Sequence, residues 1–108
     1  MITVSLLYPA EPGATFDYDY YERVHLPLVA RLWADTGFGG SEAMHGVSGA
    51  DGGPPTYLAV ALLRFDSLES FTAAVQSEAG AQVLGDVPNY TNVQPIVQVN
   101  QPLWDTRG

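Results

Sequence analysis

His25 is the residue of this chain best suited to chemistry, and two tyrosines precede it at helical spacing. Tyr21 lies one turn before His25, and Tyr18 lies two turns before it. The three side chains therefore share one face of the helix that this segment predicts. An imidazole titrates near pH 6.5, and a phenol can donate a hydrogen bond to a carbonyl or enolate oxygen. The pattern predicts proton transfer on a small organic molecule, with His25 as acid or base and Tyr21 as the hydrogen-bond donor.

Five further residues are predicted to contact a substrate: Tyr18, His45, Asp86, Asn89 and Tyr90. The last three cluster in the loop before the final predicted strand, and loops at the ends of sheets often form the mouths of pockets. Each candidate also has a structural interpretation, because tyrosines at helical spacing pack in cores, and Asp and Asn form turns. His25 itself has the alternative role of a core histidine with its hydrogen bonds satisfied internally.

Composition excludes several kinds of chemistry for this chain. It has no cysteine and no lysine, so the four basic residues are all arginines. Thiolate nucleophiles, iron-sulfur clusters and Schiff bases on this chain are therefore excluded. A metal site built on His25 and His45 would need a third ligand, and no typical ligand spacing is present. We predict an activity that uses no metal and no bound cofactor.

The charge of the chain narrows the possible partners. Twelve acidic residues against four basic ones give a net charge of -8. This charge repels nucleic acid phosphates and anionic membrane surfaces, so we expect neither as a partner. No apolar run approaches the roughly 18 residues of a membrane span, and no basic segment follows Met1. We expect a cytoplasmic protein whose partner is a small hydrophobic or aromatic molecule.

Four strands are predicted from runs of apolar and β-branched residues bounded by turn residues, over 2–8, 41–48, 56–65 and 92–99. Pro95 predicts that the last strand lies at an edge or carries a bulge. The third strand is apolar on both sides, which indicates that both faces of the sheet are buried. One chain of this length cannot cover both faces, so we predict a homodimer in which two sheets pack together.

Two helices are predicted between these strands. The first begins at a cap near Asp17 or Asp19 and ends near Gly37, with Pro27 expected to kink it next to His25. The second begins at Ser67 and ends at Gly80, with one more turn over 81–84. The element order β-α-β-β-α-β is that of the ferredoxin-like α+β fold, with a four-stranded antiparallel sheet. We expect one domain over residues 1–101 and a tail over 102–108, in which Trp104 contacts a partner subunit.

With its elements in this order, the chain resembles the EthD family, named for a component of ethyl tert-butyl ether degradation. The resemblance covers essentially the whole chain and rests on these segments: Tyr8-Pro9, Phe16-Asp17 to Tyr20-Tyr21, His25 with Pro27-Leu28, and Asp86 to Tyr90 leading to Gln94-Pro95. It implies a dimeric α+β barrel with a pocket between helices and sheet in each subunit. It does not imply one reaction, because the superfamily includes cofactor-free monooxygenases, lactone isomerases, polyketide cyclases, decarboxylases and haem enzymes. Tyr90 departs from the phenylalanine expected in many relatives.

Three functional hypotheses follow from the residues and the resemblance. The first is a small cofactor-independent acid/base enzyme of cyclase, decarboxylase, dehydratase or isomerase type, acting on an aromatic or polyketide-like carbonyl compound. A cofactor-free monooxygenase is a variant of it, in which the same base generates an electron-rich anion that reacts with oxygen. The second is an accessory protein that binds a hydrophobic metabolite for an oxygenase. In the third, the pocket is fully packed and binds nothing.

Overall fold

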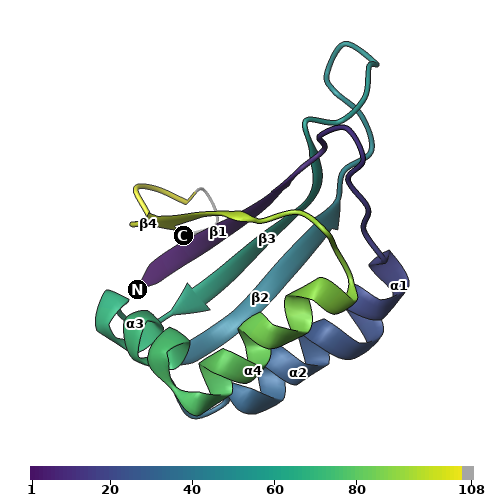
Figure 1. Cartoon of the computed structure of the whole chain (residues 1–108). Helices are drawn as coiled ribbons and strands as arrows, with labels where there is room; N and C mark the ends of the chain where they lie inside the picture. Colours follow the sequence, from purple (N-terminus) through teal and green to yellow (C-terminus); the bar gives the residue numbers. More distant parts are fainter. Residues whose placement is uncertain (106–108) are drawn as a thin grey trace.

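The computed structural model describes residues 1–105 and contains one antiparallel sheet in the order β2-β3-β1-β4. The strands are β1 (Ile2–Pro9), β2 (Phe38–His45), β3 (Tyr57–Phe65) and β4 (Ile96–Asn100). Figure 1 shows the helices together on one face of this sheet. The predicted ferredoxin-like α+β fold is therefore confirmed, and β4 lies at an edge, as Pro95 indicated.

The limits of β2 and β4 differ most from the prediction, whereas β1 and β3 each differ by one residue at one end. β2 begins at Phe38 instead of residue 41, because a register shift between Phe38 and Ser41 accommodates the two glycines between them. Gly40 has a φ of 103°, which residues with a Cβ rarely adopt. β4 begins at Ile96, directly after Pro95, because proline cannot donate a hydrogen bond to the neighbouring strand.

The first helical region is continuous from Tyr18 to Leu32 but contains a turn of π-helix. Its parts are α1 (Tyr18–Tyr20), η1 (Tyr21–His25) and α2 (Leu26–Leu32). Asp17 is the N-cap and accepts a hydrogen bond from the Tyr20 amide at 3.0 Å. Pro27 does not end the helix; it lies in the first residues of α2, directly after the π-turn. The irregularity expected beside His25 takes the form of this π-turn.

The second helical region is two helices, α3 (Leu68–Gln76) and α4 (Glu78–Asp86), followed by a short 3-10 turn, η2 (Val87–Asn89). Ser67 caps α3, as predicted. The prediction that Gly80 ends the helix was wrong, since the break falls at Ser77. The Ser77 hydroxyl donates to the carbonyl of Ala74 at 2.6 Å and accepts from the amide of Gly80 at 3.0 Å. One serine hydroxyl thus pairs with a backbone carbonyl at the end of α3 and with a backbone amide at the start of α4.

The two faces of the sheet have different environments. Side chains of β3 that point toward the helices, such as Ala61 and Phe65, are buried. On the opposite face, Val60 pairs with Leu7 and Met44, and Leu7 pairs with Ile96. These four side chains form an apolar row across all four strands, which we call the outer row. No described helix covers it, and Met44 and Ile96 are 45% and 50% exposed.

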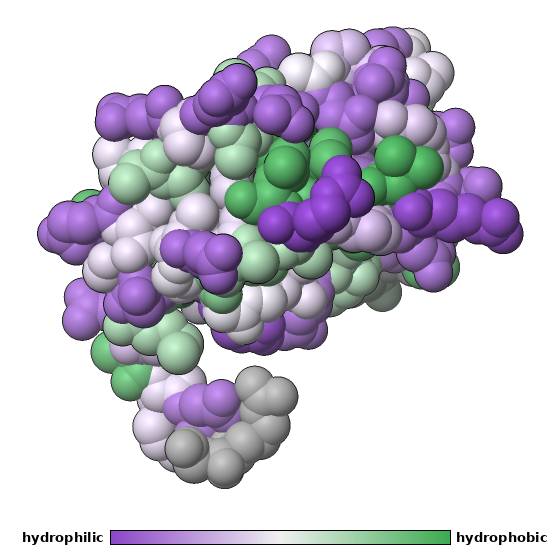
Figure 2. Space-filling model, turned by 90° about the horizontal axis from the view of Figure 1, so that it is seen from below, coloured by the Kyte–Doolittle hydropathy of each residue, from purple (hydrophilic) through white to green (hydrophobic). Residues whose placement is uncertain are grey.

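The chain continues beyond β4 without a helix or strand as far as residue 105. Leu103 and Trp104 in this segment are 99% and 84% exposed. Figure 2 shows the segment standing clear of the body of the molecule. The last three residues of the expected tail, 106–108, lie outside the described part of the chain. Among residues 1–105, no helix has the length and apolar character needed to cross a membrane.

Candidate active site

A cavity of about 220 Å³ lies between the sheet and the helices, and we call it the inner cavity. Most of its lining is aliphatic or aromatic and comes from β1, β3, α2 and α4. Leu84 and Val97 line it and are 55% and 51% exposed, so the inner cavity opens between α4 and β4. Its polar groups include His25 and three tyrosines: Tyr8, Tyr21 and Tyr90.

His25 is held in this cavity by a carboxylate behind it. Only 5% of the residue is exposed, and its Nδ1 lies 2.9 Å from Oδ2 of Asp86. A carboxylate is only an acceptor, so Nδ1 carries the proton and Nε2 carries the lone pair of the neutral ring. Nε2 lies 3.5 Å from the hydroxyl of Tyr90. The arrangement therefore presents a basic nitrogen on the side of the ring that faces Tyr90.

Asp86 is fixed by two further donors from outside the cavity. Its Oδ1 accepts hydrogen bonds from the Tyr20 hydroxyl at 2.6 Å and from the Asn89 amide at 2.9 Å. Burial raises the pKa of Asp86, but the hydrogen bonds from Tyr20, Asn89 and His25 outweigh it and hold the pKa below the usual value. The group is therefore a carboxylate at neutral pH, and every one of these bonds is made to its charged form.

The π-turn explains how Tyr20 and His25 reach the same carboxylate. These residues are five positions apart, which in a regular α-helix of 3.6 residues per turn places side chains about 140° apart. In η1 the amide of Leu26 bonds to the carbonyl of Tyr21, five residues earlier. The wider turn rotates Tyr20 and His25 toward one side of the helix. Both side chains then contact Asp86.

The pKa of His25 is lower than that of a free imidazole. Burial lowers the pKa, and the hydrogen bond and charge of Asp86 raise it by less. Because free histidine titrates near pH 6.5, His25 is neutral at pH 7 and protonates only in more acidic solution. A group in this state can accept a proton at neutral pH, and it loses this ability as the pH falls through its pKa.

We expect Asp86→Asn to lower the pKa of His25 further, because burial remains while the compensating charge is removed. An NMR titration of the imidazole Hε1 signals measures the effect. The chain has only two histidines, and His45→Asn assigns the signals. A higher pKa of His25 in Asp86→Asn would contradict this electrostatic role of Asp86.

The tyrosines of the cavity form a second set of donors. The hydroxyls of Tyr8 and Tyr90 are 2.7 Å apart. Burial raises the pKa of both residues, so both keep their protons at neutral pH. One hydroxyl donates to the other, and the second hydroxyl keeps a proton that it can donate to a ligand. Tyr21, the phenol predicted beside His25, stacks on the ring of His25, with centroids 5.5 Å apart, and its role as hydrogen-bond donor stays a prediction. Tyr90 is the phenol placed next to Nε2.

Tyr8 is a functional candidate that was not predicted from the sequence. Val4, Leu6 and Tyr8 alternate along β1, so the strand pattern could have placed Tyr8 on the buried face. Only the fold brings it to Tyr90, which is 82 positions away in the chain. The role of Tyr20 was equally hard to predict from the sequence, because its partner Asp86 is 66 positions away in the chain.

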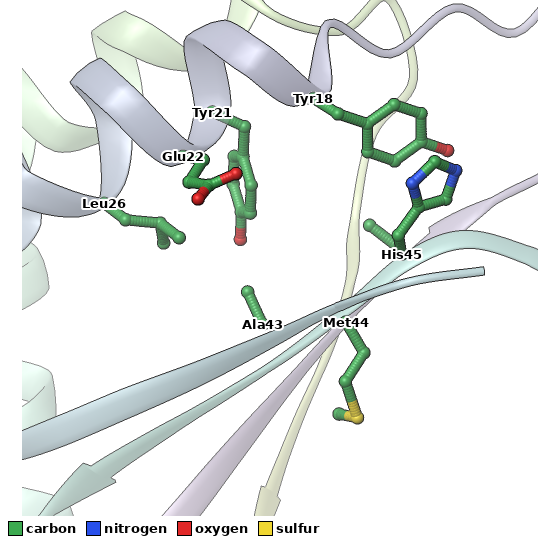
Figure 3. A pocket seen from close by; sticks show the side chains of 8 residues that line it. Tyr18, Tyr21, Glu22, Leu26, Ala43, Met44 and His45 are labelled. Carbon is green, nitrogen blue, oxygen red and sulfur yellow. The ribbon is translucent and has the colours of Figure 1, made fainter.

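Tyr18 and His45 were predicted to contact the same substrate as His25, but they lie at another pocket. Their rings stack on each other, with centroids 3.6 Å apart and planes 13° apart. They line a separate space of about 350 Å³ between η1 and β2, which we call the outer pocket (Figure 3). Of the predicted site residues, the structure brings together His25, Tyr21, Asp86, Asn89 and Tyr90. Within residues 1–105, no group of three or more His, Cys, Asp or Glu side chains is arranged to hold a metal ion.

This fold recurs in solved structures from several bacteria. An EthD-like protein from Ralstonia eutropha JMP134 is 33% identical and superposes with a TM-score of 0.88 over 99% of this chain and 96% of its own. An ethyl tert-butyl ether (EthD) family protein from Bacillus halodurans C-125 shares 17% identity and the fold, with a TM-score of 0.74 over 95% of this chain and 99% of its own. These likenesses define a small protein of the ferredoxin-like α+β fold.

Sequence similarity identifies the family, which the shared fold alone does not. The EthD domain model matches residues 13–94, which include His25, Asp86 and Tyr90. An 11.0 kDa protein encoded in the thcB-thcC intergenic region of Rhodococcus erythropolis is 31% identical over 91 residues, covering 84% of this chain and 82% of the relative. The chain belongs to the EthD family.

Proposed function

We propose that this protein is a small acid/base enzyme that moves protons on an aromatic or polyketide-like carbonyl compound bound in the inner cavity. The observation that carries the proposal is the contact series Asp86, His25, Tyr90, which ends in an apolar cavity. Asp86 orients His25, and Nε2 acts as the base. The reaction types that this chemistry covers are isomerisation, cyclisation, decarboxylation and dehydration, and it requires no metal or organic cofactor.

The elementary step is removal of a proton next to a carbonyl group. Nε2 of His25 takes the proton from carbon, and the C–H electron pair moves to form an enolate. The Tyr90 hydroxyl donates a hydrogen bond to the enolate oxygen, supported by its partner Tyr8. The imidazolium, stabilised by Asp86, then returns the proton to another atom of the substrate. The protein ends in its initial state.

The size and lining of the inner cavity restrict the substrate. A volume of about 220 Å³ is below the ~300–1,000 Å³ of pockets for drug-sized ligands, which favours a molecule with one or two rings. The aliphatic side chains around it favour an uncharged, apolar body. A single general base contributes about 10² to 10⁴ in rate, so the substrate carbon must already be acidified by a neighbouring carbonyl.

Hydrogen exchange on a model ketone tests this proposal without knowledge of the natural substrate. We expect the protein to accelerate exchange of the protons next to the carbonyl of 2-tetralone in D₂O at pH 7.5, followed by ¹H NMR. Free imidazole at the same concentration is the control for unspecific base catalysis. Exchange no faster than with imidazole, together with saturable binding of the ketone in the inner cavity, would instead support an accessory protein that carries a hydrophobic metabolite.

We further propose that the protein is a homodimer in which the outer rows of two subunits face each other. The outer row is apolar and uncovered in one chain, and faces of this kind are typical of subunit contacts. The exposed side chain of Trp104, in the tail, offers a second apolar contact for the partner subunit. A cytoplasmic location and the absence of nucleic acid and membrane partners stay predictions from charge and composition.

We expect Val60→Glu to convert the dimer to a monomer, because it places a charge in the centre of the outer row. Sedimentation equilibrium at micromolar concentration measures the change. Val47→Glu is the matched control, since Val47 is 85% exposed and lies outside the sheet. A wild-type protein that is monomeric at these concentrations would exclude the proposed dimer.

A further inference from the structure

We propose that the outer pocket is a second binding site, for a small flat molecule that carries a cationic amine. Its volume of about 350 Å³ lies within the ~300–1,000 Å³ range of small-molecule sites. It lies between the helical turn η1 and the strands β2 and β3 (Figure 3), and it shares Tyr21 and Leu26 with the inner cavity. The proposal does not depend on any catalytic role of His25.

Aromatic rings stand on two sides of this pocket. Tyr18 and His45 form the stacked pair on one side, and Tyr21 stands on the other (Figure 3). The hydroxyl of Tyr18 donates to the carbonyl of Leu58 at 2.8 Å, which fixes the orientation of its ring. A planar ligand can therefore contact ring faces or edges on both sides without reorganising the pocket.

The charge of the lining selects the ligand. Glu22 contributes a carboxylate beside the ring of Tyr21, and Figure 3 shows this side chain on the helix above β2. Of the described residues that line the pocket, none is an arginine. An ammonium group gains an ion pair with Glu22 and a cation-π contact with the tyrosine rings. A carboxylate in the same position would be repelled by Glu22 and by the net charge of -8.

The outer pocket and the inner cavity are neighbours with different chemistry. Tyr21 and Leu26 line both of them, but Tyr21 is only 5% exposed and stands between the two spaces. The inner cavity is mainly aliphatic and aromatic, with His25 and tyrosines among its polar groups and no carboxylate among the described residues that line it, whereas the outer pocket has the carboxylate of Glu22. A ligand with an amine is therefore expected in the outer pocket, and an uncharged carbonyl compound in the inner cavity.

Three probes of similar shape and different charge test the proposal: benzylammonium, benzyl alcohol and benzoate. Each is titrated into the ¹⁵N-labelled protein at pH 7.5, and the amide signals are followed. We expect benzylammonium to shift the signals of residues 43–45 and to bind about two- to fivefold more tightly than benzyl alcohol, which is the effect of one exposed ion pair. Benzoate should produce no saturable shift.

Two variants separate the charge of the site from its shape. Glu22→Gln should remove the preference for the ammonium over the alcohol, whereas Glu11→Gln, an exposed carboxylate outside the pocket, should leave it unchanged. His45→Ala should weaken both probes by opening the stacked pair. Equal affinity for the three probes in the wild-type protein, or shifts confined to Val83 and Val97 of the inner cavity, would overturn the proposal.

Discussion

Replacing His25 with asparagine should reduce the exchange of ketone protons by about 10² to 10⁴, which is the usual contribution of one general base. The amide nitrogen of asparagine can take the place of Nδ1 and keep the contact with Asp86, while nothing replaces Nε2. The cavity and its tyrosines remain. We therefore expect a lower rate constant with little change in ketone affinity, measured as kcat and KM in the exchange assay.

His45→Asn is the matched control for this experiment. His45 is the other histidine of the chain, but it stacks on Tyr18 and is not among the residues that line the inner cavity. The control variant should keep the wild-type rate. Equal losses of activity in the two variants would show that His25 has no special role. Unfolding of His25→Asn would show that His25 serves chiefly as a packed, hydrogen-bonded residue of the core.

Replacing Gly80 with alanine should destabilise the protein by about 4 kcal/mol or more, which is at the upper end of single substitutions. Gly80 lies inside α4, where the helix passes close to the end of α3. A Cβ at this position would lie 2.2 Å from the carbonyl oxygen of Val75 and 2.3 Å from that of Ala74. These are backbone atoms and cannot rotate away, so the two helices would have to separate. Denaturation by urea measures the loss.

Gly85→Ala, a substitution in the same helix, should have the opposite effect on stability. Apart from the adjacent residues and the nearby backbone of α4 itself, no atom lies within 4 Å of a Cβ at position 85, so alanine adds no clash. It should stabilise the protein by about 0.5–1 kcal/mol, because alanine has the higher helix propensity. Similar urea midpoints for Gly80→Ala and Gly85→Ala would contradict the close approach of α3 and α4.

Much of the fold could be predicted from the sequence because its signals are local. Runs of apolar and β-branched residues bounded by turn residues mark β1 and β3, and Asp17 and Ser67 mark the starts of two helical regions. Boundaries that depend on longer-range geometry could not be predicted. The bulge that lets β2 begin at Phe38 requires a partner strand, and glycine at position 80 is explained only by the approach of α3.

The candidate site was predicted in part, for a physical reason. Tyr21 and His25 are one turn apart, so helical periodicity alone puts them together. Asp86 and Tyr90 could be selected as polar residues of a loop, but not as partners of His25. Their contacts with it join positions 61 and 65 apart in the chain. No local pattern encodes contacts of this length.

The sequence by itself determined which chemistry is accessible and which elements form, because side-chain types and short-range periodicity are properties of the chain. It supplied an imidazole and phenols, excluded thiolates and amines, and defined the order of strands and helices. The tertiary structure decided which groups meet. The π-turn directs both Tyr20 and His25 to Asp86, and packing of helices on the sheet places Tyr90 at Nε2 while leaving Tyr18 and His45 in a different pocket. Such contacts depend on how distant segments pack, since the spacing between them in the chain carries no information about their distance in space.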